Sequence, residues 1–307
     1  MKPFYVSLKP FLNHADLKRP SDWPKIFGNA RPLELEIGFG NGEYLERLSR
    51  EHPDVNFVGF EQYCERIQRT LRKLSRTGLD NVRVLRLDVR AGLERFFAPR
   101  TVRFMHCLYP PPWPKKSDIK HRLFTQEFLS LVNSRLVDKG TLKIVTDHQP
   151  YVEWIQENVA DTGFAVTFEK IAANYGTKFE KKWVDGGQRE FYELLLVKDR
   201  HMPVGVKEDI ALQSYALEHF SPQNFSFNDY SKDGVAVAFK EILYDPQKKT
   251  AIIHVIACDG PMTQNVRIVV AYSKDKWRVN LAEGGMLMPT MAVAQALECV
   301  YEAAKKS

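Results

Sequence analysis

The sequence predicts an α/β protein with a doubly wound, mostly parallel sheet, followed by a small α+β domain. Short apolar runs alternate with helical stretches from residue 33 to residue 163, which is the pattern of βαβ units. After residue 200 the pattern changes, and four apolar runs follow one another with only short turns between them. We therefore expect an N-terminal segment at 1–30, the doubly wound domain at 31–200 and the C-terminal α+β domain at 201–307.

Local signals place the elements of the first sheet. LELEI at 33–37 is a short apolar run before a glycine turn, which is typical of a buried parallel strand. Further parallel strands are expected at 55–61, 81–89, 102–109 and 140–147, with helices at 43–52, 64–78, 93–97, 123–137 and 151–163. The runs 164–171 and 189–198 are expected to form an antiparallel pair at the edge of the sheet.

The C-terminal region predicts an antiparallel meander covered by one helix. Its strands are expected at 233–245, 249–260, 265–274 and 276–285. The last helix, at 290–306, has an apolar stripe that can cover one face of the sheet.

Composition narrows the class of protein. The chain has 307 residues, 44% of them hydrophobic and 27% charged, as in soluble globular proteins. No apolar run is long enough to span a membrane and the start lacks the core of a signal peptide, so we expect a cytoplasmic protein. Four cysteines lie far apart without zinc-site spacing, which predicts reduced, buried thiols and no metal.

The positive charge lies in the first two thirds of the chain. The formal net charge is +6, and residues 201–307 hold 11 Lys and Arg against 12 Asp and Glu, which leaves 33 against 26 for residues 1–200 (44 minus 11 and 38 minus 12). This excess is compatible with a polyanionic partner or with an ordinary solvated surface.

A glycine-rich turn follows the first strand. Glu36 precedes Gly38, Gly40 and Gly42, and glycines at every second position let the backbone pass close to a ligand. The spacing is not the G-x-G-x-x-G of dinucleotide binders, and an acid beside the turn repels phosphate and favours a cationic ligand. S-adenosylmethionine, which carries an ammonium and a sulfonium, fits this pattern; a purely structural turn is the alternative.

Two more acids follow the next strands. Glu61 ends the run at 55–61, where an acid can accept both hydroxyls of a ribose, and Asp88 lies at the end of the next run, at 81–89, where it can accept the amino group of an adenine. Each acid alone is more often a solvated side chain, but the carboxyl ends of consecutive parallel strands meet at the ligand-binding edge of such a sheet.

The stretch LYPPPWPKK at 108–116 predicts an ordered loop, because its prolines fit neither a helix interior nor a central strand. One interpretation is an active-site rim that presents Trp113 and Lys115, and the other is a polyproline linker. Arg122, at the start of the next helix, is a further candidate for contact with phosphate.

Several motifs together resemble the bacterial tRNA (guanine-N7)-methyltransferases. They are EIGFGNGE, FVGFE, PPPWPKK, TDHQPY at 146–151 and TKFE at 177–180, and the likeness covers about residues 20–198. The resemblance implies a class I methyltransferase sheet and methyl transfer from S-adenosylmethionine to guanine 46 in the variable loop of tRNA. It implies cofactor contacts at Glu36, the glycines, Glu61 and Asp88, and substrate contacts at Lys115, Asp147, Thr177, Lys178, Phe179 and Glu180. Asp147 and Glu180 are the expected catalytic acids. The sequence does not choose between a monomer and a homodimer.

Where the family usually has F-P-D-P-W-P-K, the chain has YPPPWPK at 109–115, so Tyr109 stands in place of the phenylalanine and Pro111 in place of the aspartate. Guanine N7 already has a free lone pair, so no general base is required and the loss predicts a slower enzyme. The alternative is a non-catalytic tRNA-binding protein that retains the fold.

The helix at 64–78 carries Arg66, Arg69, Arg72, Lys73 and Arg76. These cations can form either a plain solvated face or a stripe that contacts tRNA.

Overall fold

The computed structural model describes residues 5–260, 262–284 and 286–307, so the first four residues of the expected N-terminal segment lie outside it. The chain divides into two compact units, Met1–Lys207 and Glu208–Ser307. None of the helices in the described ranges combines the length and the apolar content that crossing a bilayer requires.

The first unit contains an eight-stranded sheet in the order β1-β4-β3-β2-β5-β6-β8-β7. Its strands are β1 (Phe11–Leu12), β2 (Leu33–Ile37), β3 (Asn56–Glu61), β4 (Val82–Arg86), β5 (Val102–Leu108), β6 (Leu136–Thr146), β7 (Phe164–Ile171) and β8 (Phe191–Lys198). Strands β1 to β6 run parallel, and β8 lies antiparallel between β6 and β7. The doubly wound sheet and its antiparallel edge pair are therefore confirmed.

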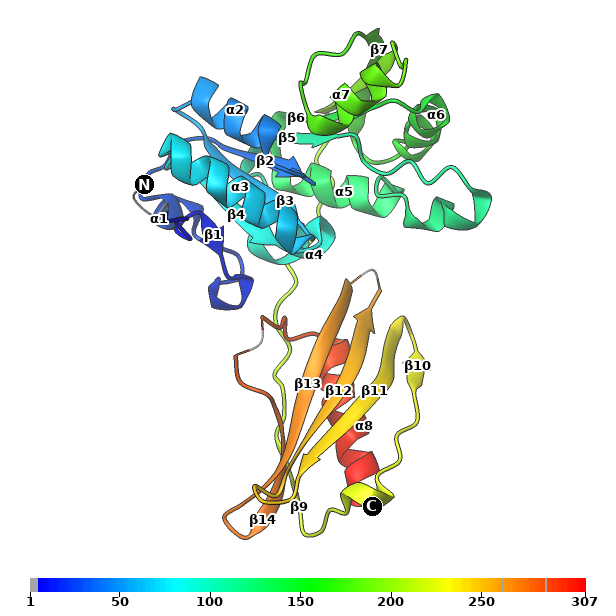
Figure 1. The fold of residues 1–307 in the computed structure, drawn as a ribbon. Helices are drawn as coiled ribbons and strands as arrows, with labels where there is room; N and C mark the ends of the chain where they lie inside the picture. Colours follow the sequence, from blue (N-terminus) through cyan, green and yellow to red (C-terminus); the bar gives the residue numbers. More distant parts are fainter. Residues whose placement is uncertain (1–4, 261, 285) are drawn as a thin grey trace. The chain divides into compact units, whose positions relative to one another are not determined.

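Helices cover both faces of this sheet. They are α1 (Trp23–Phe27), α2 (Glu43–Glu51), α3 (Cys64–Thr77), α4 (Val89–Phe96), α5 (Gln126–Arg135), α6 (Gln149–Asn158) and α7 (Lys178–Asp185). Helix α2 packs beside α3, and α4 packs beside α5 (Figure 1). The strand order reverses between β2 and β5, and the carboxyl ends of strands at such a switch point are where open α/β sheets bind ligands.

Local capping accounts for one shifted boundary. Helix α5 begins at Gln126, three residues later than predicted, because the hydroxyl of Thr125 accepts a hydrogen bond from the amide of Phe128 at 3.3 Å. The two-residue strand β1 was not predicted, since it is too short to show a periodic pattern.

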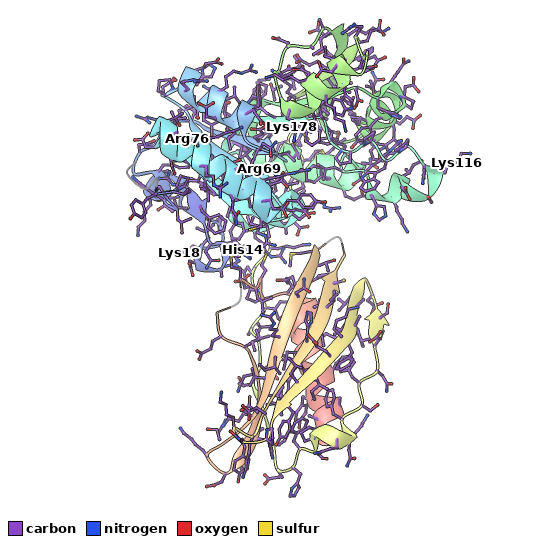
Figure 2. The ribbon with its side chains drawn as sticks, viewed as in Figure 1. His14, Lys18, Arg69, Arg76, Lys116 and Lys178 are labelled. Atoms are coloured by element: carbon purple, nitrogen blue, oxygen red, sulfur yellow. The ribbon has the colours of Figure 1, made fainter. Side chains whose placement is uncertain are left out.

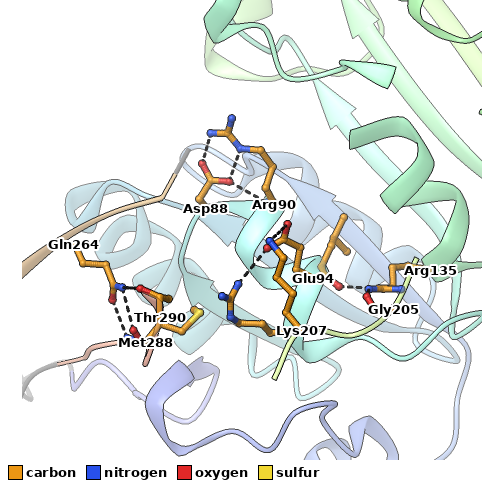
Figure 3. Close-up of polar contacts among 11 residues, drawn as sticks. Asp88, Arg90, Glu94, Arg135, Gly205, Lys207, Gln264, Met288 and Thr290 are labelled. Carbon is orange, nitrogen blue, oxygen red and sulfur yellow. Dashed lines mark hydrogen bonds and ion pairs between the residues drawn. The ribbon is translucent and has the colours of Figure 1, made fainter. Parts of the chain in front are cut away.

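Residues 201–207 belong to the first unit, so the division lies seven residues beyond the expected boundary at residue 200. The fully buried guanidinium of Arg135 donates to the carbonyls of Val204 and Gly205 at 2.7 and 2.8 Å (Figure 3). Lys207 forms an ion pair with Glu94 at 2.9 Å. These contacts hold the segment after β8 against α4 and α5.

The second unit is a six-stranded antiparallel sheet in the order β10-β11-β12-β13-β14-β9. Its elements are β9 (Tyr215–Leu217), β10 (Tyr230–Lys232), β11 (Val235–Asp245), β12 (Thr250–Asp259), β13 (Met262–Ser273), β14 (Lys276–Leu281) and α8 (Met291–Lys305). The four-strand meander and the covering helix α8 are as predicted, whereas the three-residue edge strands β9 and β10 were missed. Val293, Ala296 and Val300 of α8 share a buried core with the sheet.

The cysteines are free thiols, but only Cys107 is buried. Burial raises the pKa of this thiol above its ordinary range. Cys64 is exposed because it opens α3 at the surface, so the expectation of four buried thiols was wrong.

Candidate active site

Glu36 lies at the carboxyl end of β2, in the part of the sheet where the strand order reverses. Its side chain is buried, and its Oε2 atom has no hydrogen-bond partner among the described residues. Burial raises the pKa of Glu36 to about 8, with the nearby carboxylate of Glu43 adding to the rise. An unpartnered buried carboxyl oxygen is costly unless a ligand satisfies it, so Glu36 is a candidate for contact with a ligand.

The glycine turn lies directly after Glu36 and has a left-handed backbone. Gly38, Gly40 and Gly42 have φ values of 71°, 58° and 74°, in a region that residues with a Cβ rarely adopt. The amide of Gly40 donates to Glu61 Oε2 at 3.1 Å, which ties the turn to the end of β3.

We expect Gly42→Ala to destabilise the fold by about 2–5 kcal/mol. A Cβ at Gly42 would lie 2.5 Å from Thr70 Oγ1 of α3, which adds overpacking to the cost of the left-handed backbone. Gly38→Ala is the matched control, because Gly38 has nearly the same φ but nothing within 4 Å of the added Cβ. It should lose only about 1–2 kcal/mol. Equal losses in urea unfolding of the two variants would refute the packing argument.

Glu61, at the end of β3, already has a full set of hydrogen bonds. Its Oε1 atom accepts from the amides of Gln62 and Tyr63 at 2.8 and 3.1 Å. Its Oε2 atom accepts from Gly40 and from the guanidinium of Arg66 at 3.3 Å. A ribose at this carboxylate therefore has to displace one of these hydrogen-bond donors, and Arg66 is the one that donates from a side chain.

Asp88 lies two residues beyond the end of β4, as the N-cap of α4, and not at the end of the strand as predicted. Its Oδ1 atom accepts from the amide and from the guanidinium of Arg90, both at 2.9 Å. Its Oδ2 atom accepts from the same guanidinium at 2.7 Å and from the side-chain amide of Gln62 at 3.0 Å. Asp88 thus has a structural role as a cap, and contact with an adenine amino group requires exchange of one of these partners.

The proline loop after β5 is ordered and turns sharply. Tyr109 and Trp113 both have positive φ values, 57° and 45°. The side chain of Trp113 is 38% exposed and packs its ring 5.4 Å from that of His121. Lys115 is exposed, and Figure 2 shows Lys116 projecting from the short helix that follows. The exposed Pro111 offers no hydrogen-bonding side chain.

The structure corrects the expectation that Arg122 contacts phosphate. Arg122 is buried, and its guanidinium donates to the carbonyl of Pro112 at 2.8 Å and to that of Trp113 at 3.4 Å. The guanidinium also lies 5.2 Å from the ring centres of both Tyr151 and Trp154. Arg122 therefore holds the proline loop in place from beneath.

The TKFE motif forms the start of α7. Thr177 is the N-cap, and its hydroxyl accepts from the amide of Glu180 at 3.2 Å. The Glu180 carboxylate turns back and accepts from the amides of Asn174, Tyr175 and Gly176. Burial raises the pKa of Glu180, but the hydrogen bonds from Tyr175, Tyr109 and the neighbouring amides outweigh it and hold the pKa below its ordinary value.

The fourth partner of Glu180 is the hydroxyl of Tyr109, at 2.7 Å. Three of these hydrogen bonds are to Oε1, whereas Oε2 accepts from Gly176 alone among the described residues. The structure shows Glu180 joining α7 to the proline loop, and contact between Glu180 and the base stays a prediction. Sequence reasoning missed Tyr109, although its place directly before the prolines was a signal.

Asp147 and Phe179 are the remaining predicted site residues. Asp147, directly after β6, is half-buried, and no hydrogen bond or ion pair joins its carboxylate to another described residue. Phe179 is 41% exposed and lies 3.9 Å from the position of a Cβ at Gly40. Lys178 is exposed beside it. The first turn of α7 therefore borders the glycine turn.

The comparisons with known proteins agree with this geometry. A family described as a putative methyltransferase matches residues 30–193, more than half of the chain. The tRNA (guanine-N(7)-)-methyltransferase of Chlorobium phaeobacteroides is 35% identical over 181 residues, which are 59% of this chain and 89% of the relative. The enzyme of that name from Coprothermobacter proteolyticus is also 35% identical, over 85% of this chain and 83% of the relative. The chain belongs to the tRNA (guanine-N7)-methyltransferase family.

Membership of this methyltransferase family extends past the first unit, because the alignment with the Coprothermobacter relative covers more residues than Met1–Lys207 contains. Among solved structures, the 16S rRNA methyltransferase KamB matches with a TM-score of 0.48 and 15% identity over 60% of this chain and 96% of that one. The fold class itself rests on the strand order and the family membership.

Proposed function

We propose that the protein transfers a methyl group from S-adenosylmethionine to N7 of guanine 46, in the variable loop of tRNA, and that it acts in the cytoplasm. Residues 31–200 contain the proposed site. The observation that carries the proposal is the buried Glu36 carboxyl, which lacks a partner among the described residues and lies beside a left-handed glycine turn at the ligand-binding edge of the sheet. Family membership supplies the substrate class.

The residues present fit the proposed methyl donor. Glu36 is the one of the three predicted cofactor acids with a buried oxygen left unsatisfied by the described residues, and its ionised form would pair with the ammonium group of the donor. The glycine turn leaves the backbone open at Gly38, where an added Cβ would meet no atom within 4 Å. Glu61 and Asp88 can accept hydrogen bonds from the hydroxyl and amino groups of S-adenosylmethionine if the side chains of Arg66 and Arg90 move aside.

The reaction requires the protein to align the methyl group with guanine N7 more than to transfer a proton. When bound, S-adenosylmethionine supplies an electrophilic methyl group on a sulfonium. Guanine N7 attacks with an in-plane lone pair, so no proton has to leave first and no general base is needed. Placing two reactants in line can account for many orders of magnitude in rate. The proline loop and α7, held together by Tyr109 and Glu180, are placed to do this.

The positive charge moves from sulfur to the base during transfer, so an acid near the base favours the reaction. Pro111 cannot supply that charge, whereas the half-buried Asp147 can. One missing charge-assisted hydrogen bond costs about 1.5–3 kcal/mol, which is a rate factor of about 10 to 150. We therefore propose that the enzyme is slower than relatives with an aspartate at the position of Pro111, and that Asp147 is the acid beside the guanine.

Labelled S-adenosylmethionine and unmodified tRNA test this function. We expect label in the tRNA, as 7-methylguanosine at one guanine of the variable loop, and a strong loss of transfer in Asp147→Asn. Bound donor and bound tRNA without transfer would contradict the proposal and favour a non-catalytic tRNA-binding protein. Label at another nucleotide would keep the transferase and contradict its target.

A further inference from the structure

Helix α3 concentrates the positive charge of the molecule. Its 14 residues contain five Lys and Arg, at 66, 69, 72, 73 and 76, against one acid, Glu65. The helix therefore has a net charge of +4 (five minus one), compared with +6 for the whole chain. Arg69, Arg72 and Arg76 are exposed. Figure 2 shows Arg69 and Arg76 at two points along the same helix.

This charge is only partly neutralised within the protein. Arg66 pairs with Glu61 at 3.3 Å, and Lys73 pairs with Glu43 at 2.9 Å. Arg69 instead donates to the neutral side chain of Asn41 at 3.1 Å. For Arg72, no acid of the described residues lies within ion-pair distance. Among the described residues, these two exposed guanidinium groups therefore lack a counter-charge.

The arrangement is unfavourable for an isolated helix. Like charges three or four residues apart occur five times in α3, in the pairs 66–69, 69–72, 73–76, 69–73 and 72–76. Each such pair destabilises a helix in low salt, so together they weaken α3. A polyanion bound along the helix would offset this repulsion.

The charged face begins at the proposed donor site. Arg69 contacts Asn41, which lies within the glycine turn. The guanidinium of Arg66 lies 5.6 Å from the ring centre of Phe179, which borders Gly40. The exposed Lys178 precedes Phe179 at the start of α7. A nucleic acid that delivers a base to this site therefore passes these cations.

We propose that Arg69, Arg72 and Lys178 form a phosphate-binding stripe that holds the tRNA backbone next to the target nucleotide. The inference rests on the proposed function, because it assumes that tRNA is the substrate. Guanidinium groups suit this role, since they bind phosphate through paired hydrogen bonds and stay charged at all physiological pH values. The stripe carries no base-specific contact, so it contributes to affinity and not to the choice of the guanine.

The test is the salt dependence of tRNA binding in Arg69→Gln/Arg72→Gln. Each lost phosphate contact lowers the slope of log affinity against log salt by about 0.7–0.9, so we expect a decrease of about 1.4–1.8. At 0.1 M salt the same loss corresponds to an affinity about 25- to 60-fold weaker. The KM for tRNA should rise accordingly. Arg72→Gln alone, which leaves the contact of Arg69 with Asn41 in place, should lower the slope by about half as much.

Lys232→Gln/Lys240→Gln is the matched control, because it removes two exposed positive charges from the second unit. It should keep the slope of the unmodified protein. An unchanged slope in Arg69→Gln/Arg72→Gln, or an equal decrease in the control, would overturn the stripe even if the protein methylates tRNA. If the unmodified protein binds tRNA but transfers no methyl group, the proposed function fails and the slopes still decide the stripe. Absence of any tRNA binding overturns both.

Discussion

Replacing Glu180 with glutamine should destabilise the first unit by about 3 kcal/mol and slow methyl transfer about 100-fold. The carboxylate accepts hydrogen bonds from three consecutive amides and from Tyr109, and the glutamine amide cannot accept all four. The hydrogen bond between the proline loop and α7 would then weaken, and a displacement of about 1 Å can cost a factor of about 100 in rate. Urea unfolding and single-turnover transfer measure the two effects.

The pH dependence of unfolding tests whether the ionised carboxylate of Glu180 is the source of this stabilisation. The pKa of Glu180 is lower in the folded protein than its ordinary value of 4.5. The folded state therefore holds fewer protons, and the stabilisation is present above pH 4.5 and is lost as the pH falls below it. Glu180→Gln should lack this acid-sensitive component. A variant that unfolds with the acid sensitivity of the unmodified protein would contradict the assignment.

Tyr109→Phe tests the hydrogen bond that the hydroxyl of Tyr109 donates to Glu180 of α7. It removes the hydroxyl and keeps the ring contacts with Trp183 and Phe191, at 4.9 and 5.7 Å. We expect a loss in kcat with an unchanged affinity for the methyl donor, because the hydroxyl of Tyr109 is bonded to Glu180 of α7 and not to Glu36, Glu61 or Asp88. A purely structural role would instead lower stability and leave kcat unchanged.

Glu36→Gln should stabilise the free protein at pH 8 and weaken the binding of S-adenosylmethionine. The pKa of Glu36 is raised to about 8 by burial, so the folded state keeps a proton that the unfolded chain releases above about pH 4.5. Stability therefore falls as the pH rises towards 8, by about 1.4 kcal/mol per pH unit, and glutamine removes this fall. The loss of the charged partner should weaken donor binding about 10- to 150-fold.

Thermal unfolding with and without the donor separates these effects. At pH 8 without S-adenosylmethionine, Glu36→Gln should unfold at a higher temperature than the unmodified protein. Adding S-adenosylmethionine should raise the unfolding temperature of the variant by less. A variant that is less stable at pH 8 and binds the donor normally would show that Glu36 is an ordinary structural residue.

The sequence predicted the parts of the structure that depend on local pattern. The alternation of apolar runs and helices located the parallel strands, and the order of Glu36, Glu61 and Asp88 along the chain placed them at one edge of the sheet. The glycine spacing predicted a turn, and the structure shows that its three glycines have positive φ, which glycine adopts at low cost.

The partner of each polar side chain was not predictable in the same way. Arg122 and Glu180 have sequence neighbours typical of substrate contacts, yet tertiary packing turns both inward to bind the backbone. Asp88 likewise caps helix α4 and accepts hydrogen bonds from Arg90, two residues away. These outcomes depend on which donor lies within reach after folding. The three-residue strands β9 and β10 were missed because they are too short to show alternation.

The affinity for S-adenosylmethionine at pH 6 and at pH 8, measured by calorimetry, tests the central claim most directly. With a pKa of about 8, about 1% of Glu36 is ionised at pH 6 and about half at pH 8, so the donor should bind about 50-fold more tightly at the higher pH. Glu36→Gln should show no such increase. Equal affinity at both pH values, or no binding at millimolar donor, would contradict a buried carboxylate as the anchor of the methyl donor.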